Sequence, residues 1–222
     1  MEHALRSTNI FIIGYLAIGA GILYGHVADV WWLRFYLKPF IMTILLLGSV
    51  TTPDQRQIKN KKVFLLAMVF AGMGDVFLLF KNFFIHGLGA FLVMQILYTV
   101  VFRQDIKMPL KWPGVKLGGI AMVLALILGV VLPHLNDPVL SVAVPVYALS
   151  ISLMAAAASF RNYRVSRKSY RMVLAGAILF MVSDTLIAYT SFVQPIAGQG
   201  FWIMSTYLAA QYLIFAGMLK TG

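Results

Sequence analysis

The chain has 222 residues, of which 61% are hydrophobic and only 11% are charged. About a quarter of the residues of a soluble domain are charged, and a core of this size could not bury so many apolar side chains. The composition therefore excludes an ordinary soluble protein and places the chain in a lipid bilayer. Because there is no cysteine, disulfides, thiolate metal sites and cysteine nucleophiles are excluded as well.

Apolar runs of roughly 20 residues are long enough to cross a bilayer as helices. The connections between these runs are short, so we expect a single integral-membrane domain over residues 1–222 with an all-α, polytopic fold. Eight spans are predicted, and in chain order they are Thr8–Tyr24, Leu33–Val50, Val63–Phe80, Phe83–Phe102, Gly114–Leu132, Val139–Phe160, Tyr170–Thr190 and Gly200–Leu219.

The 18 Lys and Arg residues are distributed unequally between the two sides of these spans. Only Arg34, Lys38 and Lys81 fall on the side opposite the termini. By the positive-inside rule, both termini are then cytoplasmic. Topology and attraction to anionic lipid head groups account for the net charge of +11. A nucleic-acid partner is not expected, because the basic residues form loop clusters without interleaved aromatics.

Asp75 and Asp184 are the two acidic residues that fall inside predicted spans. Each is expected about five or six residues before the outer end of its helix, which places both carboxylates at a similar depth. An aspartate near the bilayer centre costs about 3 kcal/mol, so each must face the bundle interior or a wet cavity. The other acidic residues fall in termini or connections and are expected to be solvated: Glu2, Asp29, Asp54, Asp105 and Asp137.

Matching polar residues in helices four apart indicate an internal repeat. Asp75 and Asp184 lie in the third and seventh spans, and Gln95 and Gln211 lie in the fourth and eighth. This pattern predicts two parallel four-helix halves that bring the two aspartates together at a pseudo-symmetric centre. Two carboxylates in one partly dry cavity repel each other, so we expect one to be protonated and the other ionised. Acid-catalysed hydrolysis uses such a pair.

Other polar side chains in the spans have both structural and functional interpretations. Lys38 could hold a carboxylate ionised or bind a lipid phosphate, or it could extend to the outer head groups. Five uncharged residues could be simple interhelical hydrogen-bond partners, namely Gln95, Tyr98, Tyr147, Tyr207 and Gln211. The aspartate pair could likewise be a structural contact between helices.

The sequence gives no support for a metal, a cofactor or a serine nucleophile. The four histidines are far apart, which makes an imidazole-built metal site improbable. There is no nucleophile elbow, zinc-protease motif or phosphate loop. We therefore expect no metal site and no organic cofactor.

Several landmarks occur in a recognisable order: Lys38-Pro39, Gly74-Asp75, Gly87–Phe91 leading to Tyr98, the Gly176–Asp184 stretch, and Tyr207 to Gln211. With these motifs the chain resembles the YhhN-type family of eight-span membrane proteins, the lysoplasmalogenases, over essentially its whole length. One position departs from the family pattern, because many members have histidine where this chain has Gln95. A histidine-dependent role at that position is therefore not expected here.

The resemblance implies hydrolysis of the vinyl ether bond of lysoplasmalogens, which releases a fatty aldehyde and glycerophosphocholine or glycerophosphoethanolamine. It implies that Asp75 and Asp184 share the acid and carboxylate roles, as in glycoside hydrolysis. Asp184 is favoured as the proton donor because two glycines lie near Asp75 for a substrate to approach, but the reverse assignment stays open. Lys38 would bind the phosphate or tune the acids. The residues that would orient water and head group are Gln95, Tyr98, Tyr147, Tyr207 and Gln211.

Two other classes of function remain open from the sequence. A small transporter would also place charged groups near the midplane and show two repeats, and a lysolipid-binding protein would use the acids only structurally. The expected partners are a lysophospholipid substrate and membrane lipids. Head-group preference, chain-length preference and oligomeric state stay open. A bacterial cytoplasmic membrane is the favoured location, with the endoplasmic reticulum as the alternative.

Overall fold

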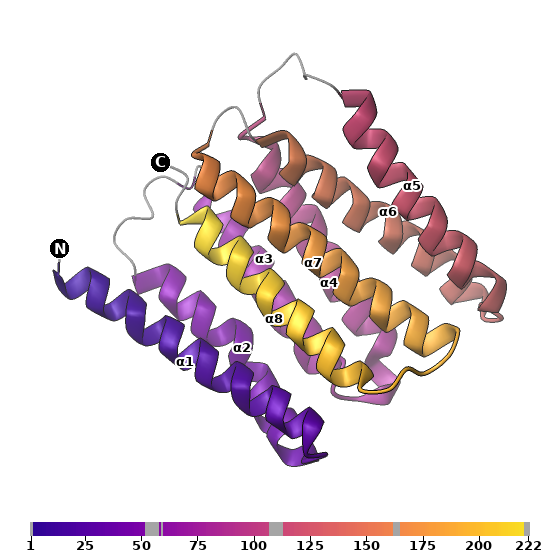
Figure 1. The fold of residues 1–222 in the computed structure, drawn as a ribbon, viewed down its shortest axis with the longest axis horizontal. Helices are drawn as coiled ribbons and strands as arrows, with labels where there is room; N and C mark the ends of the chain where they lie inside the picture. The colour runs from indigo at the N-terminus through magenta and orange to yellow at the C-terminus, as the bar shows by residue number, and fades with distance from the viewer. Residues whose placement is uncertain (1, 52–57, 59, 107–112, 162–164, 220–222) are drawn as a thin grey trace.

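The computed structural model describes the chain apart from residues 1, 52–57, 59, 107–112, 162–164 and 220–222. The described residues form eight α-helices and two short 3-10 helices, with no strand among them (Figure 1). In chain order these are α1 (Glu2–Val27), α2 (Trp31–Thr51), α3 (Lys61–Phe77), η2 (Lys81–Phe83), α4 (Phe84–Arg103), α5 (Pro113–Val131), η3 (Leu132–His134), α6 (Pro138–Phe160), α7 (Arg167–Phe192) and α8 (Gln199–Met218).

Every predicted span is covered by one of these helices, with shifts of a few residues at most ends. Seven of the helical stretches in the described part are long and apolar enough to cross a membrane, and α3, with 17 residues, is the shorter exception. Large apolar side chains cover the outside of the bundle, where acyl chains can solvate them, and Ile13, Leu16 and Val142 are 65%, 58% and 66% exposed. The all-α integral-membrane fold is thus confirmed, while eight crossings stay a prediction.

The helices lie side by side, and α1 begins at the same end of the bundle at which α8 ends (Figure 1). We call this the inner end and the opposite one the outer end. The N-terminal helices α1–α2, α2–α3 and α3–α4 pack in sequence, as do α5–α6, α6–α7 and α7–α8 in the second half. Packing of α4 against α6 joins the halves. This order is compatible with the predicted repeat; the repeat itself and cytoplasmic termini stay predictions.

Close contact between α7 and α8 depends on glycine. A Cβ atom on Gly176 would lie 2.8 Å from the carbonyl oxygen of Ala210, and one on Gly217 would lie 2.7 Å from a methyl group of Val173. Small residues of this kind let helix backbones approach within a bilayer, where dispersion and not water exclusion holds helices together. The pair α7–α8 therefore forms a tightly packed unit that carries part of the site described below.

Helix ends are defined by local capping. The Asp137 carboxylate accepts hydrogen bonds from the backbone amides of Val139 (2.7 Å) and Leu140 (3.1 Å), with Pro138 as the first residue of α6. Ser166 accepts one from the amide of Ser169 at the start of α7 (3.2 Å). Such caps satisfy amides that have no partner inside the helix. They fix where α6 and α7 begin and so set the depth of the residues on them.

An ion pair at the inner end corrects one sequence-based expectation. Asp105, expected to be solvated, is 8% exposed, and Arg161 just after α6 is fully buried. The Arg161 guanidinium donates to Asp105 Oδ2 from Nε (3.1 Å) and Nη2 (2.9 Å), and it lies over the Phe102 ring at 5.3 Å. The expectation was wrong because α4 packs against α6, which covers the connection that follows α4.

We predict that Asp105→Asn destabilises the protein, because Arg161 would keep its buried charge without an anionic partner. Breaking a buried pair in this way costs about 3–5 kcal/mol. The midpoint of thermal unfolding, followed by circular dichroism in detergent, should fall by several degrees. Asp137→Asn is the matched control, since asparagine caps a helix as well as aspartate does. Equal midpoints for the two variants would contradict the prediction.

Candidate active site

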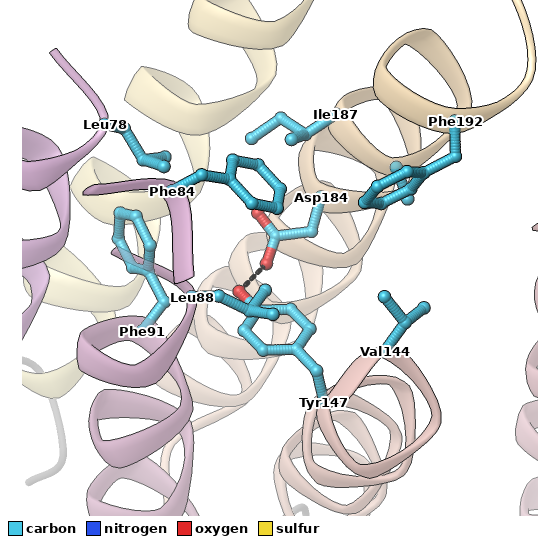
Figure 2. Close-up of a pocket in the computed structure, with 10 residues that line it drawn as sticks. Leu78, Phe84, Leu88, Phe91, Val144, Tyr147, Asp184, Ile187 and Phe192 are labelled. Atoms are coloured by element: carbon cyan, nitrogen blue, oxygen red, sulfur yellow. Dashed lines mark hydrogen bonds between the residues drawn. The ribbon is translucent and has the colours of Figure 1, made fainter. Parts of the chain in front are cut away.

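Asp184 lines a small cavity between α4, α6 and α7 (Figure 2). The hydroxyl of Tyr147, on α6, donates a hydrogen bond to Asp184 Oδ2 (Figure 2). The remaining lining residues are apolar, namely Leu78, Phe84, Leu88, Phe91, Val144, Ile187, Ala188 and Phe192. The cavity therefore contains one carboxyl group, which is hydrogen-bonded to a phenol, and its remaining lining is apolar.

The size of this cavity limits what it can hold. Its volume is about 50 Å³, and one water molecule needs roughly 10–15 Å³ measured in this way. A few waters or one short segment of a chain fit, but a whole lipid does not. Any lipid that reached Asp184 would have to extend into neighbouring space.

Asp75 forms a second carboxylate–phenol pair, deeper in the protein. It lies on α3, is 1% exposed, and accepts a 2.6 Å hydrogen bond at Oδ2 from the hydroxyl of Tyr207 on α8. Lys38, half-buried on α2, attracts Asp75 electrostatically. Asp75 is not among the residues that line the Asp184 cavity. The two aspartates thus have the same kind of hydrogen-bond donor but different access.

Phe91 forms the wall between the two pairs. It lines the Asp184 cavity and packs against the Tyr207 ring, with centroids 6.0 Å apart. On its other side it abuts Gly74, where a Cβ atom would lie 2.7 Å from the ring. Asp75 lies within electrostatic range of Asp184, so a charge on Asp75 affects Asp184 although the Phe91 ring lies beside both pairs.

The expected spacing of the aspartates from their helix ends is wrong. α3 ends at Phe77, only two residues after Asp75, whereas α7 continues past Asp184 to Phe192. The reason is that α3 stops where the chain turns into η2, while α7 runs to the longer connection before α8. Composition alone marks neither end, because apolar residues continue beyond Phe77.

Tyr98 and Gln211 bind each other and do not line the cavity. The Tyr98 hydroxyl donates to Gln211 Oε1 (3.2 Å), and Gln211 Nε2 lies 3.7 Å from the sulfur of Met94. Both residues are about 1% exposed, so they join α4 to α8 as buried polar contacts. A role of Tyr98 and Gln211 in binding a head group stays a prediction.

Gln95 has a different environment. Its side chain is fully buried and lies beside the Tyr147 hydroxyl, but neither polar atom of its amide has hydrogen-bond geometry with a described residue. Buried amides usually find partners. Gln95 lies beside Tyr147 and is not among the residues that line the Asp184 cavity.

A larger cavity opens at the outer end, next to the Asp184 cavity. Its volume is about 630 Å³, and it shares Leu78, Phe84 and Ile187 as walls with the smaller cavity. Lys38 lines it. Sequence reasoning did not identify these three wall residues, because apolar side chains in a span look alike unless packing shows which of them border a cavity.

No group of three histidine, aspartate or glutamate side chains within the described residues is placed to hold a metal ion. Carboxyl, phenol, amide and ammonium groups are present at and around the site. A carboxyl group in an apolar cavity can donate a proton to a substrate and then stabilise a neighbouring positive charge.

Comparison with known proteins identifies the family of this chain. The sequence profile of the YhhN family matches residues 33–218. The chain belongs to the YhhN family. Relatives include "Lysoplasmalogenase TMEM86B" of Sus scrofa (32% identical over 148 residues, 67% of this chain) and "Lysoplasmalogenase TMEM86A" of Bos taurus (34% over 155 residues, 67% of this chain). "Lysoplasmalogenase TMEM86B" of Homo sapiens is 32% identical over 155 residues, 70% of this chain.

These matches cover only part of each relative. They span 59% of the Sus scrofa protein and 62% of each of the other two. No solved structure matches this YhhN protein significantly. The family resemblance predicted from the sequence is confirmed, and so are the membrane setting and the link to proteins named lysoplasmalogenase.

We predict that Gly74→Ala disturbs the site and that Gly89→Ala does not. Both glycines lie inside helices, so both variants gain similar helix propensity. A Cβ at Gly74 would press on the buried Phe91 ring, whereas one at Gly89 meets no atom within 4 Å. Overpacking costs about 1–3 kcal/mol, so the unfolding midpoint of Gly74→Ala should fall below that of Gly89→Ala. A higher midpoint for Gly74→Ala would show that Phe91 does not form a rigid wall.

Proposed function

We propose that this YhhN protein hydrolyses the vinyl ether bond of lysoplasmalogens by proton transfer from Asp184. The names of the relatives support the substrate class. The observation that carries the mechanism is the placement of Asp184, whose carboxyl group faces a small apolar cavity and is held by Tyr147. The products would be a fatty aldehyde and glycerophosphocholine or glycerophosphoethanolamine.

The first step is protonation of carbon. The acid proton of Asp184 moves to the β-carbon of the vinyl ether, and the double-bond electrons form the new C–H bond. The ether oxygen then shares the positive charge of an oxocarbenium ion, and Asp184 becomes a carboxylate beside it. Tyr147 keeps one carboxyl oxygen in place, which leaves the other for the proton. An apolar cavity strengthens the attraction between the new carboxylate and the cation.

The second step is capture by water. A water oxygen attacks the α-carbon of the cation, and its proton passes to the Asp184 carboxylate, which restores the acid. The resulting hemiacetal breaks its bond to the glycerol oxygen, and the hydroxyl proton is transferred so that an aldehyde and a glycerol hydroxyl are released. Tyr147, which lines the cavity, would orient that water, and Gln95 beside its hydroxyl would support it.

Asp75 acts without touching the substrate. It lies behind Phe91, in range of Asp184 and hydrogen-bonded to Tyr207. A negative charge at that position favours the cation electrostatically, and Lys38 limits the cost of holding it in the protein. Of the two aspartates, only Asp184 lines the cavity. This geometry supports Asp184 as the proton donor, the assignment that the sequence favoured.

We predict a large loss of turnover in Asp184→Asn and a smaller loss in Asp75→Asn. Removal of a general acid typically costs about 10²- to 10⁴-fold in rate. Loss of a charge that acts through space should cost about 10- to 100-fold, because Coulomb energy at an effective dielectric constant near 20 falls with distance. The measurement is aldehyde release from alkenyl-lysophosphoethanolamine by purified protein in detergent.

Thermal unfolding of the same samples is the control, since asparagine preserves the shape of each side chain. Turnover that survives in both folded variants would exclude the aspartate mechanism. A folded wild-type protein that releases no aldehyde from ethanolamine or choline substrates would exclude the hydrolase. Transport assays would then be the next experiment.

Isotope labelling tests the order of bond changes. In D₂O, each aldehyde molecule should carry one deuterium on the carbon next to the carbonyl, because that carbon is protonated by a solvent-derived proton. In H₂¹⁸O, with the aldehyde reduced as it forms, the label should appear in the resulting alcohol and not in the released glycerophospholipid head. Label in the glycerol product would mean that the glycerol–oxygen bond breaks instead.

A further inference from the structure

The few basic residues on the outer side of the chain converge on one place. Of the 18 Lys and Arg residues, only Arg34, Lys38 and Lys81 fall on that side in the sequence. All three line the cavity of about 630 Å³ at the outer end, and His26 lines it as well. They come from α2 and from η2, so the fold brings them together.

This arrangement is unusual for a membrane protein. Basic residues are disfavoured on the non-cytoplasmic side, and three retained there would be expected to spread around the rim if they served only to contact head groups. No acidic residue is among the described residues that line the cavity. Asp29 pairs with Arg34 Nη1 at 3.0 Å, but its side chain is 90% exposed and lies outside the lining. The described lining of the cavity is therefore basic, with no acidic residue among its members.

The position of the outer cavity supports the inference as much as its basic lining does. Leu78, Phe84 and Ile187 line both this cavity and the one that holds Asp184, so the two cavities are neighbours. In a lysoplasmalogen, the vinyl ether and the phosphate are attached to opposite ends of the same glycerol. A molecule whose vinyl ether reached Asp184 from the outer end would thus leave its phosphate among the basic groups.

We propose that the outer cavity is the phosphate-binding site of the enzyme, with Arg34 and Lys81 as its contacts to the phosphate oxygens. This inference rests on the proposed function for the identity of the ligand. Lys38, which also attracts Asp75, stands between the phosphate and the acid pair. Arginine and lysine suit this task, because their hydrogen bonds to phosphate oxygens are charge-assisted. Phosphate recognition thereby specifies lysophospholipids over neutral ether lipids.

A binding experiment separates this site from catalysis. The ligands are 1-O-alkylglycerophosphoethanolamine and 1-O-alkylglycerol with the same saturated chain, so neither has a double bond to protonate. Trp31 lines the cavity, so tryptophan fluorescence of the full chain in non-ionic detergent follows occupancy. The variants are Lys81→Gln, Arg34→Gln and the charge-preserving Lys81→Arg. Arg103→Gln, at the end of α4, removes the same charge from the inner end.

The expected result is selective. The dissociation constant of the phosphate ligand should rise about three- to tenfold in Lys81→Gln and in Arg34→Gln, as for loss of one partly screened charge-assisted bond. Binding of the alkylglycerol should change less than about twofold, by the same argument, since it carries no charge to screen. Arg103→Gln and Lys81→Arg should bind both ligands as the wild type does.

Two results would overturn the proposal. One is equal weakening of both ligands, which would mean that the basic residues maintain the fold. The other is unchanged binding of the phosphate ligand in Lys81→Gln and in Arg34→Gln. Hydrolysis is measured separately with alkenyl substrates, so a phosphate-selective protein that releases no aldehyde would keep the binding site and lose the proposed function.

Discussion

An ionisable group between helices in a bilayer must be given a partner by the protein, because no water is there to solvate it. This constraint organises the molecule. Asp75 and Asp184 each have a tyrosine hydroxyl from a different helix. Those two bonds connect α3 to α8 and α6 to α7, so satisfying the carboxyl groups also fixes the helices around them. The close glycine contacts of α7 with α8 complete the same unit.

The partners differ in one respect that matters for chemistry. Tyr207 holds Asp75 where protein surrounds it on all sides, whereas Tyr147 holds Asp184 at the edge of a cavity. In the proposed mechanism, one carboxyl group meets the substrate and the other acts through its electric field. The ring of Phe91 keeps the two apart without removing their mutual influence. A pair that looks symmetric along the chain is thus asymmetric in access.

Much of the fold could be predicted from the sequence, because apolar run length is dictated by bilayer thickness. The spans follow from that rule, and the two intramembrane aspartates stand out by charge alone. Asp105 and Arg161 show where such reasoning fails. Both lie next to helix ends, where a residue is wet or buried according to how α4 and α6 pack. Packing depends on which distant residues meet, and a pattern along one sequence does not reveal those contacts.

The same limit applies to the candidate site. Tyr98 and Tyr147 are indistinguishable as tyrosines in spans, yet one contacts Gln211 and the other contacts Asp184. Arg34 and Lys81 were recognised only as exceptions to the charge distribution. Their common cavity depends on how η2 sits against α2, which no motif records. Residue types show which chemical groups are available, but tertiary contacts decide which of those groups lie together in one site.

The neighbouring position of the two cavities has a consequence for the products of the proposed reaction. An oxocarbenium ion reacts with any nearby hydroxyl group, and a lysoplasmalogen carries its own at the middle carbon of glycerol. Ring closure by that hydroxyl would give a cyclic acetal and no free aldehyde. On the proposed function, a substrate with its phosphate in the outer cavity and its ether beside Asp184 would have its glycerol stretched past Leu78, Phe84 and Ile187, which line both cavities. An extended backbone would turn the internal hydroxyl away from the cation and leave the reaction to water.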